Sequence, residues 1–139
     1  MLKLKALIYT TTGNRYLDLL SGFGVFALGR NHPVIVQALQ DVLSIDLPNL
    51  VQLDVSILSG LLAEKLASLS PKGLDRVFFA NSGTETVEAA IKFSRYATGK
   101  PKIIYCRGGY HGLSLGSLSA TGDTHYKEGF GPLVPDFIE

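Results

Sequence analysis

One stretch constrains the fold more than any other: residues 78–101, FFANSGTETVEAAIKFSRYATGKP. It opens with apolar and aromatic residues. Ser82 and Glu85 then stand in the S-x-x-E spacing of a capping box, in which the two side chains satisfy backbone N–H groups at a helix start. Gly99 and Pro101 are typical of a helix end. The stretch therefore predicts a strand, a tight turn and a helix that begins directly after Ser82.

Two apolar runs, 76–80 and 102–106, flank this helix and predict a βαβ unit with parallel strands. The segment that follows is rich in Gly, Ser and Pro, and it leaves room for one short helix at 112–119. A parallel sheet needs helices on both of its faces, so a single βαβ unit does not complete a domain. We therefore expect an α/β chain that is part of a longer protein.

The first part of the chain predicts smaller elements. Residues 7–20 hold two β-rich runs around Gly13-Asn14, a pair that favours a β-hairpin turn. Pro33 fits the first turn of a helix, and Ser56 fits the cap of a second one. Both helices carry apolar residues at a period near 3.6, which is typical of an α-helix.

The turn in front of the central helix is a candidate anion site. A helix that follows a strand in an α/β sheet points its unpaired N–H groups, and the positive end of its dipole, at the crevice beyond the strand. Gly83 lets an anion approach the backbone, and Ser82 and Thr84 add hydroxyl donors, which suits a phosphate. The alternative is that Ser-Gly-Thr serves only as a helix cap.

A second candidate lies after the next predicted strand, in the sequence CRGGYHG at 106–112. Two glycines place Tyr110 in a loop that can take unusual backbone angles, at the same edge of the crevice. Together the two loops suit a phosphorylated aromatic ligand that is anchored by its phosphate and stacked on Tyr110. Tyr110 as a packed loop residue, and His111 as a histidine bonded to backbone, are the structural alternatives.

Composition argues against several other functions. Lys plus Arg number 13 against 12 for Asp plus Glu, so no strong field favours nucleic acid or an anionic membrane. No window reaches the roughly 20 apolar residues of a membrane helix, and the single Cys106 fits a reducing compartment, so we expect a cytoplasmic protein. His32, His111 and His125 match no metal-ligand spacing, and His32 is expected to cap the helix at Pro33.

Three motifs, in order, resemble the N-terminal part of the class III aminotransferases, pyridoxal-phosphate enzymes of fold type I. They are YLDLLSGFGVFALGRNHPVIVQAL, FFANSGTETVEAAIKFSR and GGYHGLSLGSLSATG. The family includes ornithine, acetylornithine, putrescine and 4-aminobutyrate aminotransferases. The resemblance implies a small-domain segment at 1–55, followed at 56–139 by the first βαβ of the large cofactor-binding domain, which is incomplete in this chain.

The resemblance also implies roles for the two candidate loops. Ser82, Gly83 and Thr84 correspond to the family turn that binds the phosphate of pyridoxal 5′-phosphate. Tyr110 corresponds to the aromatic residue that stacks on the pyridine ring, and His111 lies beside it. The resemblance therefore agrees with the phosphate turn and stacking ring inferred from the residues.

Substrates, partners and a missing catalytic group are implied in the same way. The family implies an amino donor and a 2-oxo acid acceptor, Phe23 as a substrate-pocket residue, and a homodimer. The lysine that carries the cofactor falls beyond the point matching Glu139, so no residue here is assigned as catalytic and we expect this chain alone to be inactive. Arg30 replaces the first histidine of the family's G-H-x-H-P motif. A non-catalytic phosphate-ligand binding module and an aminomutase of the same family remain alternatives.

Overall fold

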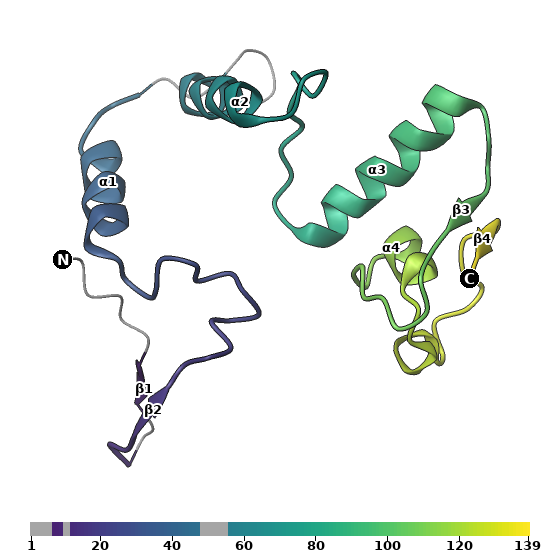
Figure 1. Ribbon diagram of the computed structural model, residues 1–139, viewed down its shortest axis with the longest axis horizontal. Helices are drawn as coiled ribbons and strands as arrows, with labels where there is room; N and C mark the ends of the chain where they lie inside the picture. Colours follow the sequence, from purple (N-terminus) through teal and green to yellow (C-terminus); the bar gives the residue numbers. More distant parts are fainter. Residues whose placement is uncertain (1–6, 10–11, 48–55) are drawn as a thin grey trace. The chain divides into compact units, whose positions relative to one another are not determined.

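The computed structural model describes residues 7–9, 12–47 and 56–139, and side chains from residue 12 onward. The chain divides into two compact units, Met1–Leu62 and Ala63–Glu139. Figure 1 shows the elements of each unit in chain order. The division falls inside a helix, and the domain split at 55/56 stays a prediction.

The first unit contains the predicted hairpin. Strand β1 (Leu7–Tyr9) pairs antiparallel with β2 (Arg15–Leu17), with Tyr9 opposite Arg15. Gly13 has a φ of 81°, a left-handed angle that glycine adopts without steric cost. The hairpin around Gly13 is thus confirmed, although the connection between Tyr9 and Arg15 is longer than a two-residue turn.

Two helices follow, and both begin where the sequence indicates. Helix α1 (Pro33–Leu43) has proline in its first turn, and His32 Nδ1 accepts a hydrogen bond from the Val34 N–H at 3.3 Å. His32 is therefore the predicted cap. Helix α2 (Ile57–Leu69) starts directly after Ser56.

Helix α3 (Gly83–Thr98) confirms the central prediction. Ser82 caps it, and both halves of the capping box with Glu85 are formed. Gly99 ends the helix in the left-handed conformation, with a φ of 66°, and its N–H donates to the Arg95 carbonyl. The sequence predicted both ends because each depends on residues that are neighbours in the chain.

The predicted strand at 76–80 is not formed, and this part of the βαβ prediction is wrong. Strand β3 (Ile103–Ile104) pairs in parallel with β4 (Phe137–Ile138) instead. A strand exists only where a neighbouring strand accepts and donates its hydrogen bonds. No described residue pairs in this way with 76–80.

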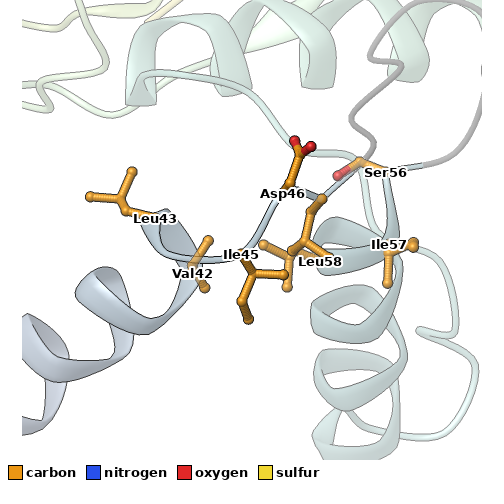
Figure 2. Close-up of a pocket in the computed structure, with 8 residues that line it drawn as sticks. Val42, Leu43, Ile45, Asp46, Ser56, Ile57 and Leu58 are labelled. Carbon is orange, nitrogen blue, oxygen red and sulfur yellow. The ribbon is translucent and has the colours of Figure 1, made fainter.

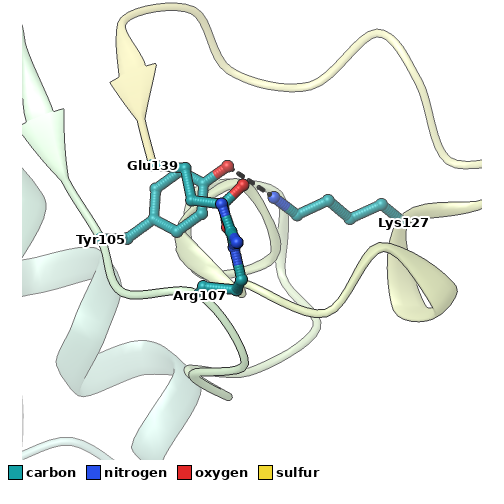
Figure 3. Close-up of polar contacts among 4 residues, drawn as sticks. All are labelled: Tyr105, Arg107, Lys127 and Glu139. Carbon is teal, nitrogen blue, oxygen red and sulfur yellow. Dashed lines mark hydrogen bonds and ion pairs between the residues drawn. The ribbon is translucent and has the colours of Figure 1, made fainter.

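Side-chain contacts hold β3 and β4 to the elements around them. Arg95 donates to the carbonyl of Pro101 from Nε at 2.8 Å and to that of Pro135 from Nη2 at 3.0 Å. Arg107 Nε donates to Glu139 Oε1 at 2.6 Å, and Figure 3 draws these two side chains next to each other. In the same view, Lys127 Nζ donates to the Tyr105 hydroxyl at 3.3 Å. These contacts join α3, β3 and the last residues of the chain.

Helix α4 (Leu115–Ala120) and the 3-10 helix η1 (Thr124–Lys127) complete the second unit. Helix α4 matches the short helix expected at 112–119, and it packs on α3. Among the described residues the buried apolar side chains are Ile91, Leu118 and Ala120. The second unit therefore has its core where α3 meets α4.

The apolar stripes of α1 and α2 are exposed in the described part of the chain. Leu39 on α1 is 59% exposed and Leu61 on α2 is 58% exposed. Helical periodicity identifies an apolar stripe, but burial also requires a partner surface, and none of the described residues covers these two faces. None of the described helices is long and apolar enough to cross a membrane.

Candidate functional site

The start of α3 presents free backbone donors. The N–H groups of Asn81 and Ser82 both donate to Glu85 Oε2, at 2.7 and 3.0 Å, and the Glu85 N–H donates to Ser82 Oγ at 3.3 Å. The N–H groups of Gly83 and Thr84 have no hydrogen-bond partner among the described residues. These two amides form the positive end of a 16-residue helix, the arrangement that binds anions in proteins.

Open space lies next to these amides. A Cβ added at Gly83 would meet no atom within 4 Å. Since Cβ atoms of a helix tilt toward its N-terminus, this space lies where an anion would approach the first turn. The glycine thus leaves the two free donors accessible.

The Tyr110 loop is held against the end of α4 by hydrogen bonds to the Thr121 side chain. The His111 N–H donates to Thr121 Oγ1 at 3.1 Å, and that hydroxyl donates to the Gly112 carbonyl at 3.2 Å. Thr121 is fully buried. Tyr110 itself is 57% exposed, and its ring meets Tyr126 edge-on with centroids 5.1 Å apart. The loop is therefore fixed while its aromatic side chain stays accessible.

These two segments line one pocket of the second unit, with a volume of about 520 Å³. Its lining residues are Ser82, Gly83, Thr84, Val87, Tyr110, His111, Gly112 and Leu113. All five residues predicted to bind the cofactor are in that set. Phe23 belongs to the first unit, where it is 89% exposed and has a φ of 57°. The roles of these six residues stay predictions.

The Thr84 hydroxyl makes contacts that the sequence did not predict. Thr84 Oγ1 lies 2.6 Å from Ser114 Oγ and 2.5 Å from Ser117 Oγ, and it accepts from the Ser114 N–H at 3.2 Å. Ser114 precedes α4 and Ser117 lies within it. The hydroxyl therefore bonds α3 to the start of α4 rather than standing free in the pocket.

Glu88 is the carboxylate at the end of this cluster. Its Oε1 accepts from Ser114 Oγ at 2.6 Å and from the N–H groups of Gly116 and Ser117 at 2.7 and 3.0 Å. Burial raises the pKa of Glu88, but these three hydrogen bonds favour the ionised form, and the resulting pKa is lowered from its ordinary value. Glu88 follows Thr84 by four residues, about one helical turn. This spacing places both side chains on the same face of α3 and was the one sequence signal that linked Glu88 to the site.

A second pocket, of about 260 Å³, lies in the first unit between the end of α1 and the start of α2 (Figure 2). Val42, Leu43, Ile45 and Leu58 give it an apolar lining, and Asp46 is its one charged side chain. None of the predicted site residues lines it. It lacks the convergent polar groups of a binding site, so we favour the pocket at α3.

Among the described residues no group of three His, Cys, Asp or Glu side chains could hold a metal ion. The α3 pocket offers two unpaired amides, the Ser82 hydroxyl and the ring of Tyr110, and His111 also lines it. Such a set binds an anionic group and a flat ring at the same time.

Comparison with known proteins identifies the family to which this site belongs. The family model described as Aminotransferase class-III matches residues 4–139, and the chain therefore belongs to the class III aminotransferases. An acetylornithine aminotransferase from Methanopyrus kandleri is 42% identical over 134 residues, which are 95% of this chain and 34% of that protein.

Solved structures show the same relationship. An (S)-enantioselective omega-transaminase from Thermomicrobium roseum superposes with a TM-score of 0.83 at 36% identity, over 96% of this chain and 31% of its own. A taurine:2-oxoglutarate aminotransferase from Bifidobacterium kashiwanohense, solved with PLP and glutamate, superposes with a TM-score of 0.84 at 31% identity. The match covers 96% of this chain and 30% of that one. The α/β fold type I assignment is confirmed, and this chain spans about a third of the length of these proteins.

Proposed function

We propose that this chain supplies the phosphate-binding turn and the ring-stacking residue of an aminotransferase that uses pyridoxal 5′-phosphate. The reaction of the whole protein would move an amino group between an amine or ω-amino acid and a 2-oxo acid. One observation carries the proposal: a single pocket brings the free amides of Gly83 and Thr84 together with the exposed ring of Tyr110.

The donor set of the pocket fits the cofactor's phosphate. Two unpaired amides face open space at a helix N-terminus, and a Cβ at Gly83 would occupy that space. Ser82 Oγ accepts from the Glu85 N–H, which leaves the Ser82 hydroxyl proton available as a third donor. A phosphate dianion is stabilised by donors of this kind without a cationic side chain.

The ring site fits the other half of the cofactor. Tyr110 is held from one side by the edge of Tyr126, and its exposed surface lines the same pocket as the amides. His111 lines the pocket beside it, and its backbone is fixed by Thr121. The contribution of these residues is to orient a flat heterocycle while the α3 turn anchors its phosphate.

Bound pyridoxal phosphate supplies the electron sink for amino-group transfer. In this chain the proposed residues bind and orient the cofactor, and none of them is assigned a proton-transfer role. Phe23 is proposed as a substrate-pocket residue. The names of two relatives include acetylornithine and taurine, and each of these compounds carries an amino group. Assembly as a homodimer and a cytoplasmic location are part of the proposal.

The proposal is tested by ligand binding to the 139-residue chain. Pyridoxine 5′-phosphate keeps the ring and phosphate but has an alcohol in place of the aldehyde, so it does not react with lysines. Calorimetric titration should show saturable binding of this ligand, with weaker binding of pyridoxine and of inorganic phosphate, since each presents half of the recognised chemistry. Equal affinity for pyridoxine and pyridoxine 5′-phosphate would refute the phosphate site. Equal affinity for inorganic phosphate and pyridoxine 5′-phosphate would instead indicate a simple anion-binding module.

A further inference from the structure

A cluster of hydroxyls and one carboxylate surrounds the Thr84 side chain. Ser114 Oγ donates to Glu88 Oε1 at 2.6 Å. Thr84 Oγ1 lies within hydrogen-bond distance of both Ser114 Oγ and Ser117 Oγ, and these two serine oxygens are 2.9 Å apart. Ser117 Oγ also donates to the Ser114 carbonyl at 3.0 Å. The carboxylate of Glu88 anchors one end of this cluster.

The cluster limits how far the Thr84 side chain can move. Its hydroxyl contacts both serine hydroxyls and accepts from the Ser114 N–H. The side chain is therefore engaged with the start of α4. The Thr84 backbone N–H stays available to the ligand, and its position depends on how firmly that side chain is held.

We propose that Glu88 is a positioning residue of the phosphate site: as the terminal acceptor of this cluster it locks the Thr84 side chain, and through it the free amides of Gly83 and Thr84. Glu88 does not line the pocket, so it acts on the ligand only through other residues. This inference rests on the proposed function for the identity of the ligand, but the locked conformation of Thr84 belongs to the chain itself.

Two glycines provide independent support, because they permit the close approach on which the cluster depends. A Cβ at Gly116 would collide with the Glu88 carboxylate and lie 2.8 Å from its Cδ. A Cβ at Gly112 would lie 2.6 Å from the Thr84 Cβ. Gly116 and Ser117 are both buried, and Glu88 beside them is half-buried.

A double-mutant cycle tests whether Glu88 acts through Thr84. The variants are Glu88→Ala, Thr84→Ala and the pair, with affinity for pyridoxine 5′-phosphate measured by calorimetry. Glu88→Ala should weaken binding about tenfold in the wild-type background, equivalent to about 1.4 kcal/mol, and should have no further effect once Thr84 is alanine. Glu64→Ala on α2 is the matched control and should leave the affinity unchanged. An equal loss in both backgrounds would mean a general structural effect and would overturn the proposal.

A second readout needs no ligand. The scalar couplings that report the Thr84 χ1 angle should indicate one rotamer in the wild-type chain and in Glu64→Ala, and averaging in Glu88→Ala. Gly116→Ala should also cause averaging of the Thr84 χ1 angle. Alanine has a higher helix propensity than glycine, so this averaging would not come from a weaker helix. Unchanged couplings in Glu88→Ala would overturn the positioning role. If Glu88→Ala changes the couplings but the wild-type chain does not bind pyridoxine 5′-phosphate, the positioning role of Glu88 stands and the proposed function is refuted.

Discussion

Replacement of Gly83 by alanine separates ligand binding from helix stability, because the two effects have opposite signs. Gly83 is the first residue of α3, its backbone lies outside the left-handed region, and a Cβ there meets no atom within 4 Å. Alanine therefore fits without strain. By reducing the freedom of the unfolded chain it should stabilise the fold by about 0.4–1 kcal/mol.

The same methyl group occupies the space through which an anion reaches the amides. If it displaces the phosphate from one of the two N–H groups, the cost is that of a hydrogen bond to a charged group, about 1.5–3 kcal/mol. Affinity for pyridoxine 5′-phosphate should then fall about 10- to 150-fold. Calorimetric titration measures the affinity, and urea unfolding followed by circular dichroism measures the stability. A Gly83→Ala chain that is more stable and binds with wild-type affinity would refute the anion site.

Three further predictions address the elements that support the pocket. Ser82→Ala removes the cap of α3 and should lower the free energy of unfolding by about 1 kcal/mol, measured by urea unfolding; a change in the stabilising direction would contradict the capping role. Gly112→Ala should destabilise the chain and shift the Thr84 resonances in NMR spectra, because Gly112 has a φ of 126° and its Cβ would collide with Thr84; an unshifted spectrum would contradict the close approach. The pKa of Glu88 is lowered in the folded chain, so its stabilising contribution is present above its ordinary pKa of 4.5 and is lost as pH falls through the folded value. Unfolding curves of wild type and Glu88→Gln should therefore converge below pH 4.5, and parallel pH profiles would contradict the lowered pKa.

The elements that the sequence predicted well are those with local causes. The capping box at Ser82 and the left-handed glycine at Gly99 define α3 because each involves residues within one turn of the helix end. The His32 cap of α1 is local in the same sense, since it bonds the N–H two residues onward. Each of these signals can be seen in a short window of sequence.

The strand predicted at 76–80 failed for a non-local reason. Its apolar and aromatic composition is that of a strand, but strand formation depends on a hydrogen-bonding neighbour, and β3 pairs with β4 instead. Burial of an apolar stripe depends on non-local contacts in the same way, and the stripes of α1 and α2 are exposed among the described residues.

The residues of the α3 pocket were predicted in part, because some have local causes and others depend on distant contacts. Ser82 and Gly83 were found from local helix-start chemistry, and Tyr110 from the position of its loop after a strand. The contacts of Thr84 with Ser114 and Ser117 could not be predicted, because they join residues 30 and 33 positions apart. Glu88 was missed although it lies one turn after Thr84, because its partners come from α4.

The most direct test of the account is an NMR titration that follows individual backbone amides of the chain as pyridoxine 5′-phosphate is added. The Gly83 and Thr84 amides should show large, saturable shifts with one shared affinity, accompanied by shifts of the Tyr110 ring protons. The Glu85 amide, already bonded to Ser82 Oγ, should move less. Saturable binding that leaves the Gly83 and Thr84 amides unshifted would contradict the central claim that the start of α3 holds the phosphate.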